Sequence, residues 1–304
     1  SAKTISAAAL ANVNKRSDLR VVQLDQFSDF HGALETTSTN AGAANLAAAF
    51  ANDRKVVPAT FTLSSGDNFG ASPVISSEFE EIPAVEALNA MKLDVSTFGN
   101  HEHDRDINHI TKMINLSEFS WVASNYSTLA PMNTGAKKVK NYVIIERGGV
   151  KIGVVGANTA ETPDVVYPGN MAGMTISPDP KYLNSAIKEA KAAGAEIVVA
   201  LVHQGWAENK GGVATGELAA TYPQLKGATV VFGGHSHLQF STISANNRWA
   251  SAITVGQVPN SGVGYNQVSV CLSSGKVVGS MLKYVTAAEI SKVTPDATAA
   301  AVVK

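Results

Sequence analysis

The chain has the composition of a packed globular protein. Hydrophobic residues make up 45% of its 304 residues and charged residues 16%, with a formal net charge of −1. A core can therefore form, and we expect neither binding to nucleic-acid polymers nor affinity for acidic membranes. No apolar run approaches the ~20 residues that span a bilayer. The single cysteine, Cys271, excludes an intrachain disulfide and a cysteine-rich zinc site, and we expect it to be a buried strand residue.

Short apolar runs alternate with segments of helical periodicity along the chain. The runs predict strands at residues 20–23, 60–63, 95–98, 121–123, 151–157, 196–202, 229–232 and 251–255, and then a hairpin of 264–272 and 277–285. The periodic segments predict helices at residues 42–52, 79–91, 108–116, 180–193 and 216–222. Because the early strands precede helices and the last two form a hairpin, we expect a single layered α/β domain with partly antiparallel pairing.

The two ends of the chain give expectations about its processing and extent. The chain begins at Ser1 rather than Met, and its small, polar residues 1–19 are expected to be an N-terminal extension of an exported protein. At the other end, Thr294 is expected to cap a helix that has Pro295 in its first turn. Residues 293–304 then either begin a helix that leads into another domain or form a short terminal helix that docks on this one.

Metal-capable side chains follow five of the predicted strands. They are Asp29 and His31, Asp67, Asn100 and His101, His203, and the pair His235 and His237. In α/β sheets the loops beyond the carboxyl ends of strands converge on one site, so we expect these distant residues to meet. Five of the seven histidines follow this pattern, and only His103 and His109 do not. A single His beside a strand is ordinarily structural, but this repeated placement favours a dinuclear metal site.

The chemistry of these side chains narrows the metal. Imidazole with carboxylate and amide groups, and without thiolate, suits Zn, Mn, Fe, Co or Ni. Sites for Mg or Ca would use mostly oxygen ligands. The candidate set is too large for one tetrahedral zinc and fits two divalent metal ions that share a carboxylate.

The ordered motifs resemble those of the calcineurin-like metallophosphoesterase superfamily. Its blocks, which read approximately DxH, GDxx, GNHE/D, H and GHxH, have counterparts here at 29–31, 66–68, 99–102, 203 and 234–237. The longer stretches SDFHGALE, SSGDNFGASP, FGNHEHD, VASNY, LVHQG and VFGGHSH, with the small-residue segment AGAANLAAAF, resemble the 5′-nucleotidase branch. The resemblance covers nearly all of residues 20–304. It implies a catalytic domain at 20–292 that folds as a four-layer α/β/β/α sandwich of two mixed β-sheets flanked by helices.

The resemblance also implies a role for each motif residue. One metal would be held by Asp29, His31 and His237, the other by Asn100, His203 and His235, and both would share Asp67. His101 would be the catalytic histidine beside the substrate, Asn100 would also contact the phosphate, and Asp104 would orient the His101 ring.

The implied reaction is hydrolysis of a phosphoester. Two metals roughly 3.5–4 Å apart can hold the attacking and leaving oxygens of an in-line displacement, and a metal-bound water can reach a pKa of ~7, so a metal-bound hydroxide is the expected nucleophile. The leading substrate is a nucleotide that loses its 5′-phosphate. The motifs leave open a 2′,3′-cyclic-nucleotide phosphodiesterase/3′-nucleotidase, a UDP-sugar hydrolase or a thiosulfohydrolase. Outside the enzymes the alternative is a catalytically silent metal-binding surface module, which the intact ligand set disfavours.

Some positions depart from the pattern of this family. His103 stands where relatives carry Phe, and we expect a packing residue of aromatic size rather than an additional metal ligand. Glu102 is expected to support its loop rather than to bind metal. No function is attached to Asn45, which stands where relatives often carry Arg. Because relatives of the 5′-nucleotidase type have a C-terminal domain that recognises the base, we expect a substrate-recognition domain after Lys304 and an exported, periplasmic, secreted or cell-surface protein.

Overall fold

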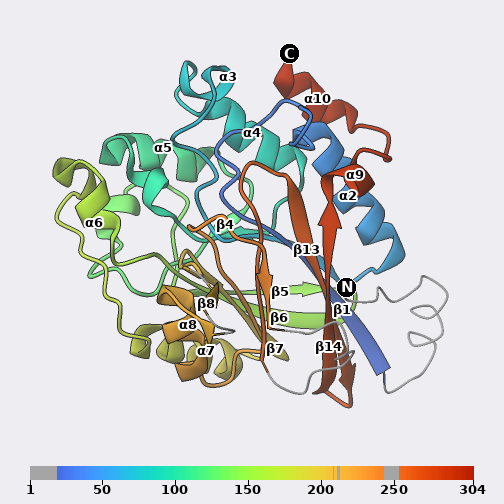
Figure 1. The fold of residues 1–304 in the computed structure, drawn as a ribbon. Helices are drawn as coiled ribbons and strands as arrows, with labels where there is room; N and C mark the ends of the chain where they lie inside the picture. The colour runs from blue at the N-terminus through green and yellow to red at the C-terminus, as the bar shows by residue number, and fades with distance from the viewer. Residues whose placement is uncertain (1–18, 208, 211–212, 243–252) are drawn as a thin grey trace.

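The computed structural model describes residues 19–207, 209–210, 213–242 and 253–304. In this part of the chain, two six-stranded mixed sheets lie between helices (Figure 1), and two further strands form a separate two-stranded ribbon. The predicted α/β/β/α arrangement of two mixed sheets flanked by helices is confirmed.

The first sheet has the strand order β14-β13-β1-β2-β3-β4. Its strands are β1 (Leu19–Phe27), β2 (Thr60–Ser64), β3 (Val95–Ser96), β4 (Ser120–Trp121), β13 (Gly264–Ser273) and β14 (Lys276–Thr286). Strands β1 to β4 are parallel neighbours, whereas β13 pairs antiparallel with both β1 and β14. The carboxyl ends of β1, β2 and β3 therefore lie at the same edge of this sheet.

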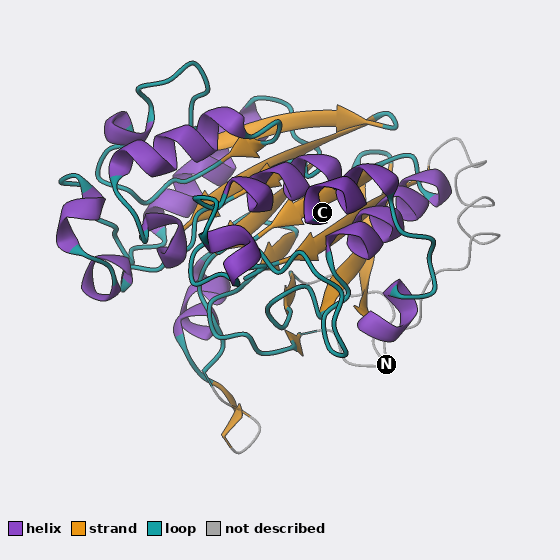
Figure 2. Cartoon of the chain, turned by 90° about the horizontal axis from the view of Figure 1, so that it is seen from above, coloured by secondary structure: helices purple, strands orange, loops and turns teal. Residues whose placement is uncertain are grey.

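The second sheet has the order β11-β12-β10-β7-β6-β5. Its strands are β5 (Tyr142–Arg147), β6 (Val150–Ala157), β7 (Ile197–Val202), β10 (Val230–Phe232), β11 (Phe240–Ser241) and β12 (Thr254–Gln257). The four inner strands are parallel, and β5 and β11 close the two edges in antiparallel pairing. The ribbon β8 (Asn209–Lys210) and β9 (Val213–Ala214) projects from the body of the molecule in the view from above (Figure 2).

Helices cover the outer face of each sheet. They are α2 (Ala43–Val56), α3 (Val74–Ser77), α4 (Ile82–Ala90), α5 (Ile107–Leu116), α6 (Thr162–Val165), α7 (Lys181–Ala192), α8 (Glu217–Thr221), α9 (Ala287–Ile290) and α10 (Ala297–Val303). Short 3₁₀ turns are η1 (Asn100–His103), η2 (Ala130–Met132), η3 (Pro168–Met171) and η4 (Tyr222–Gln224). Helices α2 and α10, from opposite ends of the chain, lie together (Figure 1). None of the described helices combines the length and apolar character that crossing a bilayer requires.

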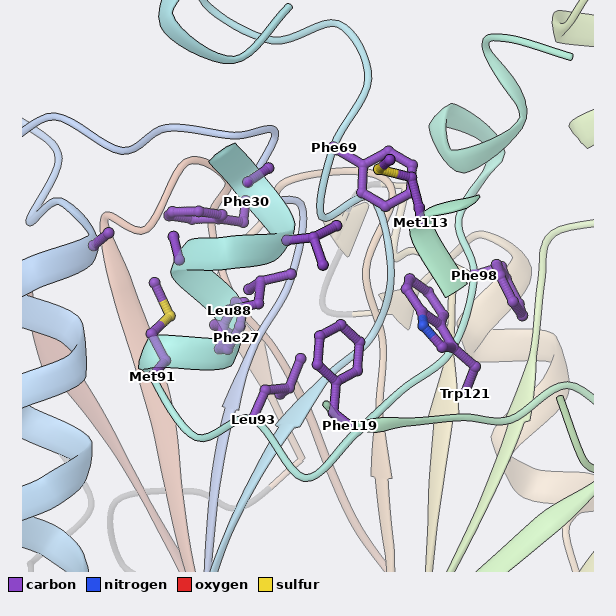
Figure 3. Packing of buried hydrophobic residues seen from close by; sticks show 14 of the residues in the cluster. Phe27, Phe30, Phe69, Leu88, Met91, Leu93, Phe98, Met113, Phe119 and Trp121 are labelled. Carbon is purple, nitrogen blue, oxygen red and sulfur yellow. The ribbon is translucent and has the colours of Figure 1, made fainter. Parts of the chain in front are cut away.

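Three hydrophobic clusters separate the four layers. The first packs helices α2, α4 and α5 on the outer face of the first sheet, and Figure 3 shows part of it around Phe30, Leu88 and Trp121. The second lies between the sheets, and the third lies beneath α7 and α8. The sequence of β7, IVVALV, is apolar throughout because both faces of the strand are buried. Val199 and Leu201 pack in the second cluster, and Val198 and Ala200 pack in the third.

Most predicted elements form close to their predicted positions, with different bounds. The first strand runs on to Phe27, whereas the strand predicted at 95–98 has only two residues. Strand β5, a half-buried edge strand, was not predicted. Cys271 is buried in β13, as predicted. Residues 1–18 and 251–252, parts of the predicted N-terminal extension and of one predicted strand, lie outside the described residues.

The cap predicted for the last helix is wrong. Asp296, not Thr294, caps α10, because its side chain accepts a hydrogen bond from the Ala299 N–H. The helix is fixed to α2 by a hydrogen bond of 3.0 Å from the Asp296 N–H to the Ala44 carbonyl, and Ala299 is fully buried. Helix α10 therefore docks on the domain, whatever follows it in sequence.

Candidate metal and catalytic site

The predicted metal-capable residues come together where the two sheets present their strand ends. Strands β1, β2 and β3 supply loops from the first sheet, and the neighbouring strands β7 and β10 supply loops from the second. Two groups of three residues could each hold a metal ion, because within each group the ligand atoms lie within 4.8 Å of one another. One group is Asp29, His31 and His237, and the other is Asp67, His203 and His235. Residues far apart in sequence thus form two adjacent candidate metal positions, and the identity of the metal stays open.

The backbone of these loops is unusual at the ligand residues themselves. Asp29, His31, Asp67, His235 and His237 have φ angles of 52°, 50°, 53°, 75° and 62°. This left-handed region costs a non-glycine residue roughly 1–2 kcal/mol, and residues held there concentrate at functional sites.

Hydrogen bonds between main chains hold the first two loops side by side. The N–H groups of Asp29, His31 and Gly32 donate to the carbonyls of residues 66, 67 and 68, each at 2.9 Å. Close approach also requires glycine at position 99, because a Cβ atom there would lie 2.1 Å from Oδ1 of Asp67. The spacing between candidate ligands is therefore set by the backbone.

Two of the imidazoles are oriented by carbonyl groups. Nδ1 of His31 lies 2.8 Å from the Gly70 oxygen, and Nδ1 of His203 lies 2.8 Å from the Ser65 oxygen. Since a carbonyl only accepts, Nδ1 carries the proton in both rings, and Nε2 is the nitrogen directed at the carboxylates. This is the arrangement in which a neutral imidazole offers a lone pair to a metal.

Unpartnered polar atoms show that the site fits divalent cations. Oδ1 of Asp29 and Oδ1 of Asn100 are buried and form no hydrogen bond, and Nε2 of His203, also buried, lies 3.0 Å from Oδ2 of Asp67. Oδ1 of Asp29 lies 3.3 Å from Nε2 of His237 and 3.8 Å from Nε2 of His203. Buried acceptors left without a donor are costly, and converging lone pairs of N and O atoms are the ligands that transition-metal ions bind.

The electrostatics of the metal-free site point the same way. Burial opposes ionisation of Asp67, but the imidazoles of His203 and His31 outweigh it and hold the pKa of Asp67 below its usual range. Burial likewise opposes a charge on His203, yet Asp67 and Asp29 raise the pKa of His203 to about 10. A proton on His203 thus compensates the carboxylates when no metal is bound, and a metal ion must displace it.

Beside the two groups stands a histidine–aspartate pair. Nδ1 of His101 lies 2.8 Å from Oδ2 of Asp104, and this hydrogen bond is the largest of the contributions that raise the pKa of His101 to about 9. The His101 ring packs against the His31 ring with centroids 5.1 Å apart. At neutral pH His101 is therefore a cationic proton donor at the edge of the candidate metal site.

Glu102 joins the loops that carry Asp67 and Asn100. Its buried carboxylate accepts N–H groups of Gly99 and Asp67 at Oε1, at 2.6 and 2.7 Å, and those of Asn68 and Phe69 at Oε2, at 2.8 and 3.4 Å. All four donors are backbone groups, and Glu102 belongs to neither metal group. Burial raises the pKa of Glu102 to about 8, so the positive charge of bound metal would favour the ionised form that accepts these bonds.

His103, which differs from the family pattern, belongs to the core. It is 1% exposed, its Nε2 lies 2.7 Å from the Tyr126 hydroxyl, and its ring lies 6.2 Å from that of Phe98. Burial lowers the pKa of His103 to about 4, so the ring is neutral. The expected packing role agrees with this position, which is outside both metal groups.

Two residues near the ligands were not predicted. The Ser28 hydroxyl donates to Oδ2 of Asp29 at 2.6 Å, and Glu161 Oε2 lies 3.2 Å from Nε2 of His235. Ser28 directly precedes a predicted ligand, and that adjacency is a signal the sequence offered. Glu161 lies in a loop after β6 with no metal-binding pattern around it, so nothing in the sequence connects it to His235.

The comparison with known protein families identifies the family of the chain. The family model described as calcineurin-like phosphoesterase matches residues 23–239. The chain belongs to the calcineurin-like phosphoesterase family. Membership confirms that the chain is a phosphoesterase of a family that uses divalent metals. The matched residues include the five strand ends that carry the candidate ligands.

Curated relatives of this phosphoesterase have several activities in their names. It is 24% identical over 308 residues to endonuclease YhcR of Bacillus subtilis, a match that covers 94% of this chain and 25% of the relative. It is 28% identical to the 2′,3′-cyclic-nucleotide 2′-phosphodiesterase/3′-nucleotidase of Haemophilus influenzae (86% of this chain, 43% of the relative). It is 25% identical to the 5′-nucleotidase of Bos taurus (76% and 40%). The chain therefore spans less than half the length of these relatives.

Solved structures share the fold. The calcineurin-like phosphoesterase YfkN from Bacillus subtilis superposes with a TM-score of 0.74 at 21% identity, covering 94% of this chain and 96% of that one. A 5′-nucleotidase precursor from Thermus thermophilus gives a TM-score of 0.75 at 20% identity, covering 93% and 57%. At this identity the likeness supports the architecture of the phosphoesterase and leaves its substrate open.

Proposed function

We propose that the chain is a catalytic domain that hydrolyses phosphoesters with two divalent metal ions, and that a nucleotide 5′-phosphate is its substrate. One observation carries the proposal. Carboxylate and imidazole side chains, among them the buried and unpartnered Oδ1 of Asp29, converge in two adjacent groups beside the His101–Asp104 pair. This arrangement serves a reaction in which negative charge develops on phosphoryl oxygens and on a leaving oxygen.

Each metal position uses its own set of side chains in this proposal. Asp29, His31 and His237 hold one ion, Asn100, His203 and His235 hold the other, and Asp67 is shared. Bound there, the two ions supply an activated water and positive charge for the phosphoryl oxygens. The inclusion of Asn100 rests on its buried, unpartnered Oδ1.

The remaining residues orient the substrate and move a proton. Asn100 and His101 contact the phosphoryl group, and His101, protonated at neutral pH, gives its Nε2 proton to the leaving oxygen. Asp104 fixes the His101 ring by accepting from Nδ1–H and stabilises the imidazolium. Because this pair stands outside the two metal groups, its substitution separates catalysis from metal binding.

A panel of substrates tests the proposed activity. The chain, loaded with Mn, is assayed with AMP, 2′,3′-cyclic AMP, UDP-glucose and bis-p-nitrophenyl phosphate, and single-stranded DNA is added because one relative is named an endonuclease. Release of phosphate from AMP supports the proposal. Turnover of the cyclic nucleotide alone assigns the phosphodiesterase alternative, which the Haemophilus influenzae relative favours by name. Turnover of none of these substrates contradicts the enzyme assignment and favours a silent metal-binding module.

We also propose that the domain works in a longer, exported protein. Its curated relatives are longer than the region of similarity, and one of them, 25% identical over 219 residues, is named cell wall protein Lmo0130 of Listeria monocytogenes. On this proposal residues 293–304 lead to a C-terminal domain that recognises the rest of the substrate. Sequencing of the gene on both sides of this segment tests both points, since an export signal and a following domain are expected.

A further inference from the structure

The turn that carries the His101–Asp104 pair is held by a loop that comes from the other sheet. After β6 the chain leaves the second sheet, contacts the turn η1 through α6 and continues into η3, which contains Asn170. Asn170 is 8% exposed, and its own N–H donates to the Tyr167 carbonyl at 2.9 Å. The next residue, Met171, is buried in the first hydrophobic cluster. Asn170 is therefore fixed in the fold beside the catalytic pair.

The side chain of Asn170 donates two hydrogen bonds to this turn. Its Nδ2 lies 3.1 Å from the carbonyl oxygen of His103 and 3.0 Å from that of Asp104. Because carbonyl groups only accept, the amide nitrogen must face them, and both of its N–H donors are used. The two carbonyls stand at the end of η1, where a helical turn has no partners of its own for its last carbonyl groups.

The two ends of the turn are thus held by complementary side chains. Before the turn, the Glu102 carboxylate accepts the N–H of Gly99 at 2.6 Å. After the turn, the Asn170 amide donates to the carbonyls of residues 103 and 104. The first contact joins the turn to the loops that carry metal ligands, and the second lies beneath Asp104.

The position of the Asp104 carboxylate depends on this backbone. Among the described residues the carboxylate forms hydrogen bonds only with Nδ1 of His101, at 2.8 and 3.0 Å, and the side chain is 34% exposed. The Asp104 N–H donates to the His101 carbonyl at 3.2 Å, which is long for such a bond. Asn170 therefore supplies the side-chain contact that fixes the main chain from which the Asp104 carboxylate extends.

We infer that Asn170 is a positioning residue for the proposed reaction, because it fixes the backbone that carries Asp104 and so keeps the carboxylate on Nδ1 of His101. This leaves Nε2 of the ring free to face the substrate. The inference rests on the proposed function. Asn170 belongs to neither candidate metal group, so its effect on the reaction passes through the His101–Asp104 pair.

A double-mutant cycle tests the inference with metal-loaded protein and AMP. Asn170→Ala should lower kcat about 10- to 100-fold, the usual effect of removing a group that orients another, and should keep about two metal ions per chain. In a His101→Ala background the same substitution should change kcat less than about twofold, because residues that act through one network are not additive. An equal fold-loss in both backgrounds would show that Asn170 serves only the fold and would overturn the inference.

Two further variants separate the hydrogen bonds from packing and from stability. Asn170→Asp keeps the size of the side chain and lacks both amide donors, so a wild-type kcat in this variant overturns the inference. Asn133 is half-buried and forms two hydrogen bonds with the Val139 backbone, at 3.2 and 2.8 Å, outside the site. Asn133→Ala should lower Tm, as Asn170→Ala does, and leave kcat unchanged. An equal fall of kcat in Asn133→Ala overturns the inference as well.

Proton NMR tests the same contact without turnover. In protein loaded with Zn, which is diamagnetic, the Nδ1–H of His101 should give a low-field signal, assigned by its absence from His101→Ala. The signal should be lost or shifted in Asn170→Ala and unchanged in Asn133→Ala. A signal missing from the wild type, or unchanged in Asn170→Ala, overturns the inference. The expected signals without hydrolysis of AMP by the wild type would contradict the proposed function alone.

Discussion

Replacement of Glu102 by glutamine tests whether one carboxylate positions two metal-binding loops. Each of its oxygens accepts two backbone N–H groups, and an amide nitrogen accepts none. Glutamine therefore leaves two of the four donors unpaired. At roughly 1–3 kcal/mol for a buried unpaired group, with the bond from Phe69 long at 3.4 Å, we expect the metal-free protein to lose about 3 kcal/mol of unfolding free energy.

The loss should appear in metal binding as well as in stability. Loosening the contact between the loops that carry Asp67 and Asn100 should weaken metal affinity about 10- to 100-fold, the usual effect of removing a group that orients ligands. Denaturant unfolding of metal-free protein gives the first quantity, and Mn titration against a competing chelator gives the second. Titration at pH 9, above the pKa of about 8 for Glu102, ensures that the wild-type carboxylate is ionised.

A matched control makes the comparison specific. Asp94 also accepts a backbone N–H, from Thr62 at 2.9 Å, and pairs with Arg147 through both oxygens, but it belongs to neither metal group. Asp94→Asn should lower the unfolding free energy without changing metal affinity. If Glu102→Gln binds Mn as tightly as the wild type, or if Asp94→Asn weakens binding equally, the reasoning about Glu102 is refuted.

Three further substitutions have distinct expected outcomes. His101→Ala should lower kcat about 10²- to 10⁴-fold with wild-type metal content, and an unchanged kcat would exclude its catalytic role. Asp104→Asn replaces the charged acceptor that raises the pKa of His101 to about 9 with a neutral one, so the alkaline limb of the kcat profile should move to lower pH; a limb that stays in place contradicts this. His103 has its pKa lowered from 6.5 to about 4, so the unfolded chain binds a proton that the folded chain does not, and stability falls by about 3 kcal/mol as pH drops through that window. His103→Phe should reduce this loss in denaturation measured at pH 7 and pH 4, and equal losses would contradict the cause.

Sequence order predicted the arrangement of the candidate ligands well for a physical reason. Asp29, Asp67 and His203 each follow a predicted strand, and parallel strands bring their ends to one edge. Recognising the strands in the sequence was therefore enough to predict that residues far apart in the chain converge. The same reasoning placed β7, because burial on both faces leaves a continuous apolar stretch.

Features that depend on tertiary burial could not be predicted in this way. Asn170 has an ordinary local sequence, and only the fold shows that its amide donates to the carbonyls of His103 and Asp104. The backbone contacts of Glu102 join loops about 35 residues apart, so its motif indicated a supporting role without its partners. At the end of the chain, Thr294 and Asp296 are both good capping residues, and the docking of α10 on α2 decides in favour of Asp296.

Metal content tests the central claim most directly. Protein purified with a divalent transition metal, freed of excess ions and analysed by mass spectrometry should contain about two ions per chain, because the described residues offer two adjacent ligand groups that share the Asp67 carboxylate in our proposal. The double variant Asp29→Asn and His237→Gln should retain about one. Wild-type protein with no bound transition metal, or a double variant that still holds two ions, would contradict the account.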